Sequence, residues 1–376
     1  MKLIAKGRKV TDKYKLESVS RACELLRQFT VDHPVWSLTE LTAVSGLERT
    51  ICFRLLKTLE AEGLLRKADG RKYASNLRLQ AGKKFRIGYA SQTHDSFADA
   101  VSQGIRWAAT ESEIDLVEFD NHYSAVTAIR NAEALAKRGI DLVVEFQTYH
   151  SAADRISQIF RAAGIPMIAV EIPHPGATFF GVDNHQVGVM AGKLLLKAVK
   201  DKWRGECDAV MLLDLGIAGA LPSLRLAGVE ATLREGLSGQ YQVSHLETRG
   251  QYVSAFEVTR KYLRFAPKRR TILTGVNDPA VLGALRAFEE VGWGNHCIAI
   301  SVGGTREARH ELRLPNTRLF GSIAFFPERY GAGILRLALD LLHKKEMPSA
   351  IYVPTQLITA HNVDQFYPQD IFENEK

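Results

Sequence analysis

The first part of the chain has apolar residues spaced every three or four positions, a pattern typical of helices that bury one side. The segment "ESVSRACELLRQF" predicts a first helix, which ends before His33 and Pro34. Its apolar stripe is formed by Val19, Ala22, Cys23, Leu25, Leu26 and Phe29. Next, "SLTE" at 37–40 matches a capping box, in which Ser37 and Glu40 each satisfy the other's backbone N–H. A short second helix is therefore predicted, and Gly46 ends it.

A third helix is predicted from Leu47 to about Glu62, with an apolar back and a polar, basic front. The back comprises Ile51, Cys52, Leu55, Leu56 and Leu59, and the front comprises Thr50, Phe53, Arg54 and Lys57. After it, "GLLRKADGRKY" predicts two short strands joined at Asp69-Gly70. A turn followed by such a helix favours a helix-turn-helix that enters the major groove, and the basic hairpin would form a wing against phosphates.

From residue 85 onward, short apolar runs alternate with helical patterns. Four runs come first, at 85–90, 114–119, 141–146 and 166–171. Five more follow, at 208–215, 241–247, 270–275, 297–302 and 318–325. This alternation predicts parallel sheets covered by helices on both faces. Because the runs are too many for one comfortable sheet, we expect an α/β body of two lobes, each built on a doubly wound parallel sheet.

Charge is distributed unevenly between these two parts. Residues 1–86 hold 19 Lys and Arg against 9 Asp and Glu, whereas residues 87–376 hold 30 against 33. The net charge of +7 on this chain of 376 residues therefore arises from its first quarter. A basic excess confined to one domain is the expected feature of a protein that binds a polyanion such as nucleic acid.

Other classes of function have little support in the sequence. The four cysteines are isolated, which predicts no metal site and suits a reducing cytosol. The opening "MKLIAKGRKV" lacks the apolar run of a signal peptide, and no stretch of about 18 apolar residues predicts a membrane span. No strand leads into a phosphate-binding glycine loop or a recognisable acid/base signature, so we expect no catalytic residue and no cofactor. These observations predict a cytoplasmic binding protein without a membrane partner.

The segments "ESVSRACELL", "SLTELTAVSGL", "RLLKTLEAEGLL" and "DGRKY" follow one another at a specific spacing. In this respect residues 18–79 resemble the winged helix-turn-helix of IclR-type transcription regulators, a small α+β domain. The resemblance implies that the third helix and the wing contact DNA, through Arg49, Thr50, Phe53, Arg54, Lys57, Arg66, Lys67, Arg71 and Lys72. Glu48 stands where the family usually has proline, and we leave this acid out of the contact set.

The roles of these contacts can be divided by their chemistry. Arg49 or Arg54 could read a guanine edge, whereas Lys57 and the wing cations would neutralise phosphates. For Phe53 two alternatives stand, contact with a thymine methyl group and packing against the wing.

The body contains "RIGYASQTHDSFADAVSQGI", "SLRLAGVEATL" and "TILTGVNDPAVLGALRAFEEVG". Through these stretches residues 85–367 are similar to the type I periplasmic binding fold, the fold of ribose-binding proteins and LacI-like sensors. The resemblance implies three hinges, near Asp183, Ala324 and Ile351. It assigns 85–183 with 325–350 to one lobe and 184–324 with 351–362 to the other. Residues 1–80 would be the DNA-binding domain, 81–84 a linker and 368–376 a tail.

In this fold the ligand binds between the lobes, at the carboxyl ends of the strands. The resemblance assigns the cleft positions to His94, Asp95, Phe97, Glu171, Arg225, Asn277, Asp278 and Phe325. Arg225 could instead be an interlobe salt-bridge partner, and His94 a solvated loop residue. Ile172, Gly303 and Phe325 replace the Arg, Asp and Gln that ribose binders use, so we expect a sugar-like ligand other than free ribose.

Together these features predict a transcription regulator that binds double-stranded operator DNA and responds to a small sugar or sugar derivative. One winged head offers a small interface, so a homodimer on two half-sites is expected. Two alternatives come from other classes. A solute-binding transport component would need export, and an α/β enzyme acting on a sugar or nucleotide would need a phosphate loop or an acid/base pair.

Overall fold

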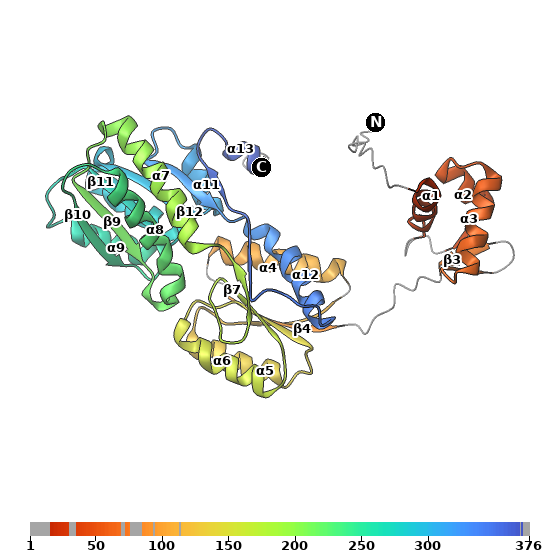
Figure 1. Cartoon of the computed structure of the whole chain (residues 1–376). Coiled ribbons are helices and arrows are strands. Elements are labelled where there is room, and N and C mark those ends of the chain that lie inside the picture. Colours follow the sequence, from red (N-terminus) through yellow and green to blue (C-terminus); the bar gives the residue numbers. More distant parts are fainter. Residues whose placement is uncertain are drawn as a thin grey trace. The chain divides into compact units, whose positions relative to one another are not determined.

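The computed structural model describes residues 16–29, 35–68, 72–75, 85–92, 95–112, 114–368 and 370. The chain divides into two compact units, Met1–Lys84 and Phe85–Lys376. The first contains three helices and a small sheet, and the second contains the α/β body (Figure 1).

The first unit has the helices and the hairpin strands that the sequence predicts. Its elements are α1 Glu17–Leu26, β1 Val35–Ser37, α2 Leu38–Ser45, α3 Arg49–Ala61, β2 Leu65–Lys67 and β3 Lys72–Ser75. The strands form an antiparallel sheet in the order β1-β3-β2. The sequence did not predict β1, because three residues are too few to show an alternating pattern. The predicted Asp69-Gly70 turn lies outside the described residues.

The predicted capping box at the start of α2 is confirmed. Ser37 Oγ accepts a hydrogen bond from the Glu40 backbone N–H at 3.2 Å, and Glu40 Oε2 accepts one from the Ser37 N–H at 2.7 Å. At the other end, Gly46 adopts a left-handed conformation with φ of 66°, which glycine tolerates without strain. The three helices and the sheet enclose a core of Leu25, Leu41, Cys52, Leu56, Leu59, Leu65 and Tyr73.

The second unit contains all nine predicted strands of the body, each within about two residues of its expected bounds. The elements up to the middle of the unit are β4 Arg86–Ser91, α4 Ser96–Glu111, β5 Asp115–Asp120, α5 Ala125–Ala136, β6 Leu142–Glu145, α6 His150–Ala162, β7 Met167–Val170, β8 Thr178–Gly181, α7 Asn184–Trp203 and β9 Ala209–Asp214. The remainder are α8 Ala220–Gly236, β10 Gln242–Glu247, α9 Tyr252–Leu263, β11 Thr271–Gly275, α10 Asp278–Glu290, β12 Cys297–Gly303, α11 Arg306–Arg313, β13 Leu319–Ala324, α12 Tyr330–Leu342, β14 Ala350–Tyr352, β15 Gln356–Ile358 and α13 Val363–Phe366.

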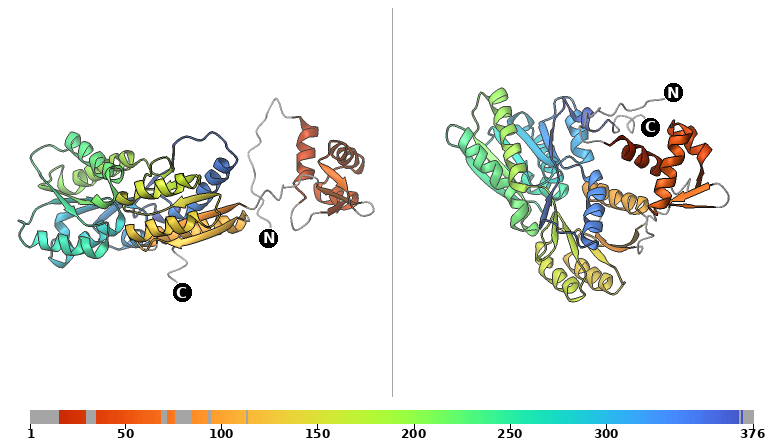
Figure 2. Two further views of the ribbon diagram at one scale, coloured as in Figure 1. Left: turned by 90° about the horizontal axis from the view of Figure 1, so that it is seen from below. Right: turned by 45° about the vertical axis from the view of Figure 1, so that its right-hand side comes forward.

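These strands form two sheets of six, which lie in separate lobes (Figures 1 and 2). The first sheet has the order β14-β8-β7-β6-β4-β5 and is parallel throughout. The second has the order β10-β9-β11-β12-β13-β15, and only β15 runs antiparallel to its neighbour. The predicted fold class, two parallel α/β lobes after a small α+β domain, is confirmed.

Helices cover both faces of each sheet, as the continuous apolar strands require. In the first sheet, Leu142 and Val144 face α4 and α12, whereas the intervening Val143 faces α5 and α6. In the second, Val210 on β9 packs toward α7 and α8, and the adjacent Met211 packs toward α9, α10 and α11. Strand residues alternate between the two faces because successive side chains point in opposite directions.

The chain passes three times between the two sheets, after β8, after β13 and after β14. The last passage differs from the expected one near Ile351. Ile351 and Tyr352 pair with Phe180 and Gly181 of β8. They therefore belong to the first lobe, and the expected assignment of 351–362 to the second lobe is wrong at these two positions. The boundary was misplaced because β14 is only three residues long, too short to be separated from the hinge by its pattern.

Candidate functional site

The front of α3 displays the side chains that the sequence analysis assigned to DNA. Arg49, Thr50, Phe53, Arg54 and Lys57 are all exposed. Phe53 keeps 44% of its surface open, so packing against the wing does not bury it. Cys52, Leu56 and Leu59 are buried on the back of the helix, as predicted.

Two cations on this front are already hydrogen-bonded. Arg49 Nη1 donates to Thr39 Oγ1 of α2 at 3.5 Å, and Lys57 Nζ donates to Glu60 Oε2 at 3.0 Å. The hydrogen bond to Glu60 raises the pKa of Lys57, so its ammonium stays charged. Within the described residues, Arg54 makes no side-chain hydrogen bond or ion pair, and its side chain is exposed.

The wing presents three exposed cations in the described residues, Arg66 and Lys67 on β2 and Lys72 on β3. Lys67 Nζ lies 3.7 Å from the centre of the Tyr73 ring. This cation–π contact holds the ammonium close to the sheet. Arg71, the fourth predicted wing cation, lies outside the described residues.

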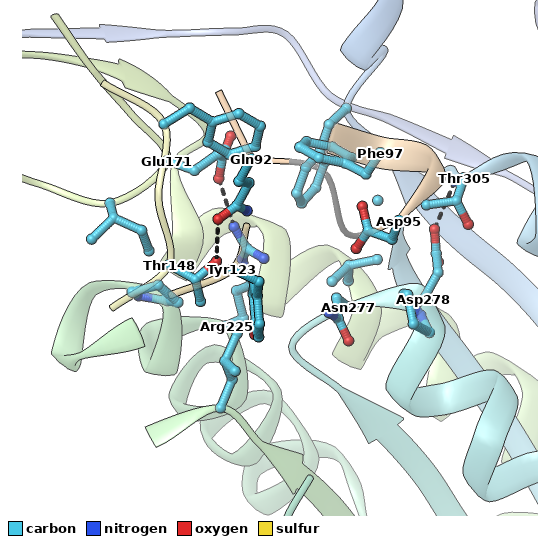
Figure 3. Close-up of a pocket in the computed structure, with 18 residues that line it drawn as sticks. Gln92, Asp95, Phe97, Tyr123, Thr148, Glu171, Arg225, Asn277, Asp278 and Thr305 are labelled. Carbon is cyan, nitrogen blue, oxygen red and sulfur yellow. Dashed lines mark hydrogen bonds and ion pairs between the residues drawn. The ribbon is translucent and has the colours of Figure 1, made fainter. Parts of the chain in front are cut away.

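In the second unit, a cavity of about 90 Å³ lies between the lobes at the carboxyl ends of the strands (Figure 3). His94 falls outside the described residues, and every other predicted ligand residue lines the cavity. These residues are Asp95, Phe97, Glu171, Arg225, Asn277, Asp278 and Phe325. Ile172 and Gly303 also line it, so all three departures from the ribose-binding pattern face the ligand space.

Arg225 of α8 connects the two lobes across this cavity. Its guanidinium donates to Glu171 Oε2 at 2.8 Å, to Asn184 Oδ1 at 2.7 Å and to the Val276 carbonyl at 2.7 Å. Glu171 belongs to the first lobe, whereas Asn184 and Val276 belong to the second. The alternative that the sequence left open for Arg225, an interlobe salt bridge, is therefore present in the structure. Phe325 lies beneath the guanidinium, with 4.9 Å between its ring centre and Cζ.

Glu171 is held in an unusual environment. Its side chain also accepts a hydrogen bond from the Tyr330 hydroxyl at 2.7 Å. Burial raises the pKa of Glu171, and the nearby Arg225 guanidinium opposes that shift. Its φ of 60° is left-handed, which is uncommon for a residue other than glycine and often marks functional positions. A Cβ at Gly181 would lie 3.1 Å from Glu171 Oε1, so the glycine leaves room for this carboxylate.

Asn277 and Asp278 line the cavity, but the protein itself occupies their polar atoms. Asn277 Oδ1 caps α10 by accepting from the Ala280 N–H at 3.2 Å, and Nδ2 donates to the Gly250 carbonyl at 2.8 Å. Asp278 accepts from the Thr305 N–H at 2.7 Å and from Ser322 Oγ at 2.9 Å. Burial raises the pKa of Asp278 to about 6. These two side chains therefore shape the second lobe's wall of the cavity.

Two predicted residues of the first lobe have local roles as well. Asp95 Oδ1 caps α4 by accepting from the Ala98 N–H at 2.9 Å. Phe97 meets Phe325 and Tyr330 edge-to-face, with ring centres 6.1 Å and 5.9 Å apart. The aromatic wall at this position therefore continues around the cavity to the Arg225 contact.

Four polar lining residues were not predicted, namely Gln92, Tyr123, Thr148 and Thr305. Gln92 Oε1 accepts from Thr148 Oγ1 at 3.1 Å, and the Tyr123 hydroxyl donates across the lobes to the Arg249 carbonyl at 3.0 Å. In Figure 3 the first three lie on the Glu171 side of the cavity, and Thr305 lies on the Asp278 side. Each closely follows the end of a parallel strand, and this position was the available signal.

Two family models match the sequence. The model described as periplasmic binding protein domain matches residues 87–346, and the model described as IclR helix-turn-helix domain matches residues 18–69. Among curated proteins, the ribose import binding protein RbsB of Bacillus subtilis is 23% identical over 289 residues. That match covers 74% of this chain and 88% of RbsB.

Solved structures share the fold of the second unit. A solute binding protein from Bacillus halodurans with bound myo-inositol has a TM-score of 0.66 and 18% identity, and the match covers 76% of this chain and 98% of that one. A solute binding protein from Actinobacillus succinogenes with bound D-allose has a TM-score of 0.66 and 20% identity, with 75% and 100% covered. At this level of identity the likeness concerns the fold.

Within the described residues, no group of three His, Cys, Asp or Glu side chains is arranged to hold a metal ion. None of the described helices is both long and apolar enough to cross a membrane.

Proposed function

The chain belongs to the periplasmic binding protein domain family and carries an IclR helix-turn-helix domain, and we propose that it is a transcription regulator. The head binds double-stranded operator DNA, and a small sugar-like ligand in the interlobe cleft controls that binding. The observation that carries this proposal is the presence of both domains in one chain.

The head supplies the chemistry that duplex recognition requires. Arg54 is exposed on α3 and is free to form a bidentate contact with a guanine edge. Lys57 and the wing residues Arg66 and Lys72 are exposed cations, which supports their proposed role in neutralising phosphates. The proposed contact set is completed by Arg49, Thr50, Phe53, Lys67 and Arg71. Since one such head buries little DNA, the regulator would act as a homodimer on two half-sites.

The cleft supplies the chemistry of a sugar site. The related solute binding proteins described above were solved with myo-inositol and D-allose, and the curated relative is named for ribose import. Phe97 and Phe325 contribute aromatic side chains to the cavity wall, and Glu171 and Arg225 supply an acceptor and a donor for hydroxyl groups. With Ile172, Gly303 and Phe325 in place of three polar residues, the ligand is a sugar or polyol other than free ribose.

Lobe closure provides the link between ligand and DNA. Contacts that join the lobes near the cleft include Arg225 with Glu171 and Tyr123 with the Arg249 carbonyl. The lobes can close to different degrees. A ligand that binds one of these conformations more tightly than another increases the population of that conformation, and only such a difference in affinity can produce the shift. In a homodimer, the change of closure would alter the spacing of the two heads and hence the affinity for a pair of half-sites.

A second candidate function is a sugar-binding component of a transporter. The names of the curated relative and of the solved structures favour it for the second unit taken alone. The IclR helix-turn-helix domain favours the regulator, because solute capture has no use for a DNA-binding head. Neither matched family is enzymatic, which supports a binding protein, and DNA as the target favours the cytoplasm.

The test is a selection from random DNA. The full-length chain is mixed with random duplexes and excess bulk competitor, bound DNA is sequenced over successive rounds, and enriched duplexes are titrated by fluorescence anisotropy. We expect a two-half-site motif, and we expect one sugar of a monosaccharide and polyol panel to change its affinity. Absence of any enriched motif, combined with measurable sugar binding, would assign the protein to solute transport. Conversion of a sugar during incubation would indicate an enzyme.

A further inference from the structure

A second and larger cavity adjoins the cleft. Its volume is about 420 Å³, compared with about 90 Å³ for the cavity between Glu171 and Asp278. Asp95, Pro279 and Thr305 line both cavities, so the two spaces are neighbours separated by these side chains. We call the cavity at Glu171 the inner chamber and the larger one the outer chamber.

The outer chamber has an apolar wall that is open to solvent. Tyr252 and Val253, at the start of α9, are 44% and 63% exposed, and Leu282 of α10 lies half-buried in the same wall. A tyrosine ring and aliphatic side chains gathered in one concave surface mark a binding site more often than a plain surface. Gln251, Ser96 and Glu307 add polar groups to its lining.

The loop that leads into α9 connects the two chambers mechanically. The Tyr123 hydroxyl and Asn277 Nδ2, both in the inner chamber, donate to the carbonyls of Arg249 and Gly250 at 3.0 Å and 2.8 Å. Arg249 and Gly250 have φ of 55° and 66°, so the loop turns sharply between the chambers. The position of Tyr252 therefore depends on side chains that a ligand in the inner chamber would touch.

The outer chamber is also formed by both lobes. Ser96 Oγ of the first lobe donates to Glu307 Oε2 of the second, and both residues line the chamber. Like the ion pair of Arg225 with Glu171, this contact joins the two lobes. A molecule that occupied both chambers would hence contact both lobes at two separate places.

We propose that the outer chamber binds the second ring of a two-ring ligand, a disaccharide whose first ring occupies the inner chamber. The inference rests on the proposed function of the cleft as a sugar site. One face of the second ring would stack on Tyr252, since sugar C–H groups suit an aromatic surface. Its hydroxyl groups would meet Ser96, Gln251 and Glu307. The three residues shared by the chambers would surround the glycosidic linkage.

The experiment compares matched sugars on matched variants by isothermal titration calorimetry of the full-length chain. The probes are glucose with maltose and cellobiose, galactose with lactose and melibiose, and myo-inositol with galactinol. We expect one disaccharide or glycoside to bind at least about tenfold more tightly than its inner unit alone. Tyr252→Ala should lower the affinity for that two-ring ligand about fivefold and leave the affinity for its inner unit unchanged. The control is Phe265→Ala, which removes another aromatic ring of the second lobe. Phe265 is 80% exposed, and its loss should change neither affinity.

The possible failures are distinguishable. If a single-ring sugar binds as tightly as every two-ring sugar built on it, the outer chamber is not a subsite, but the sugar function of the cleft stands. If Tyr252→Ala weakens both members of a pair equally, the ring acts on the cleft as a whole and the subsite is again refuted. If no probe binds the wild-type chain, the sugar assignment fails and the outer subsite fails with it.

Discussion

Replacing Arg225 with methionine removes the cation that joins the two lobes and leaves Glu171 buried without its partner. The wild-type guanidinium donates three hydrogen bonds, to Glu171, Asn184 and the Val276 carbonyl, at 2.7 to 2.8 Å. Methionine retains much of the side-chain volume over Phe325 but offers no donor. The substitution therefore tests the buried charge with little change in packing.

The size of the expected loss in unfolding free energy follows from the burial of the pair. The Arg225 and Glu171 side chains are 10% and 9% exposed, so water cannot replace the lost partner. Breaking such a pair costs about 3–5 kcal/mol, because Glu171 must either stay buried as an unpaired charge or take up a proton. At about 2–4 °C per kcal/mol for a domain of this size, the melting temperature should fall by roughly 6–20 °C. Adding Glu171→Gln removes the stranded charge and should recover about 1–3 kcal/mol.

The pH dependence has a defined sign. Without Arg225, burial raises the pKa of Glu171 further above its unfolded value. The native variant then holds a proton that the unfolded chain releases, so its stability falls as the pH rises above the unfolded pKa. The deficit of Arg225→Met relative to the wild type should therefore narrow as the pH is lowered toward the ordinary range of a carboxyl group.

Urea unfolding of the four proteins of this double-mutant cycle, at several pH values, measures these effects. The control is Arg286→Met, which breaks the exposed pair with Glu289 at 61% and 37% exposure and should cost less than about 1 kcal/mol. The reasoning is refuted if Arg225→Met costs no more than the control. It is also refuted if the double variant loses as much unfolding free energy as the two single variants together, since the two side chains would then be independent.

Three further predictions concern the head and a buried acid. Arg54→Ala should weaken the selected operator by about 1–3 kcal/mol and relax the preference for one base pair, as measured by anisotropy with single-base variants; unchanged affinity would remove Arg54 from the contact set. Lys72→Ala should lower the affinity for all duplexes alike and reduce the slope of log affinity against log salt concentration by about one unit, whereas Lys268→Ala in the second unit should do neither. A loss of affinity limited to the operator would contradict a phosphate contact of Lys72. Burial raises the pKa of Glu145 to about 8, so this carboxyl group should make wild-type stability fall by up to about 1.4 kcal/mol per pH unit between roughly pH 4.5 and 8. Glu145→Gln should make the measured slope shallower by that amount, and an unchanged slope in urea titrations would show that Glu145 is ionised in the native state.

The sequence predicted the strands of the body well because buried parallel strands are continuous apolar runs. Ile87 to Ala90 and Val210 to Leu213 stand out against the helical patterns around them. The strands that escaped prediction are β1, β8, β14 and β15, each only three or four residues long. Segments of that length show no period of their own. Without a longer apolar run or a turn dipeptide beside them, as β6, β7 and the hairpin strands have, only pairing with longer strands decides their structure. The capping box at Ser37, by contrast, is a local signal and was predicted correctly.

The cleft residues were predicted by resemblance, and their partners could not be. Arg225 and Glu171 are far apart in the sequence, and their ion pair depends on how the two lobes close. The sequence around either residue does not show whether its side chain binds a ligand or pairs with another side chain of the protein. Tyr123 was missed for a similar reason, because its hydroxyl group reaches the Arg249 carbonyl only across the closed cleft.

The closed cleft already satisfies many of its own polar groups, and this constrains the ligand. Arg225, Asn277 and Asp278 all hydrogen-bond within the protein. The proposed sugar would gain affinity there only by replacing those contacts without leaving a buried group unpaired. The pair of Arg225 and Glu171 is the interlobe contact best suited to replacement, because a hydroxyl group can accept from the guanidinium and donate to the carboxylate. A substitution that weakens this pair should therefore change the affinity of the cleft for its ligand.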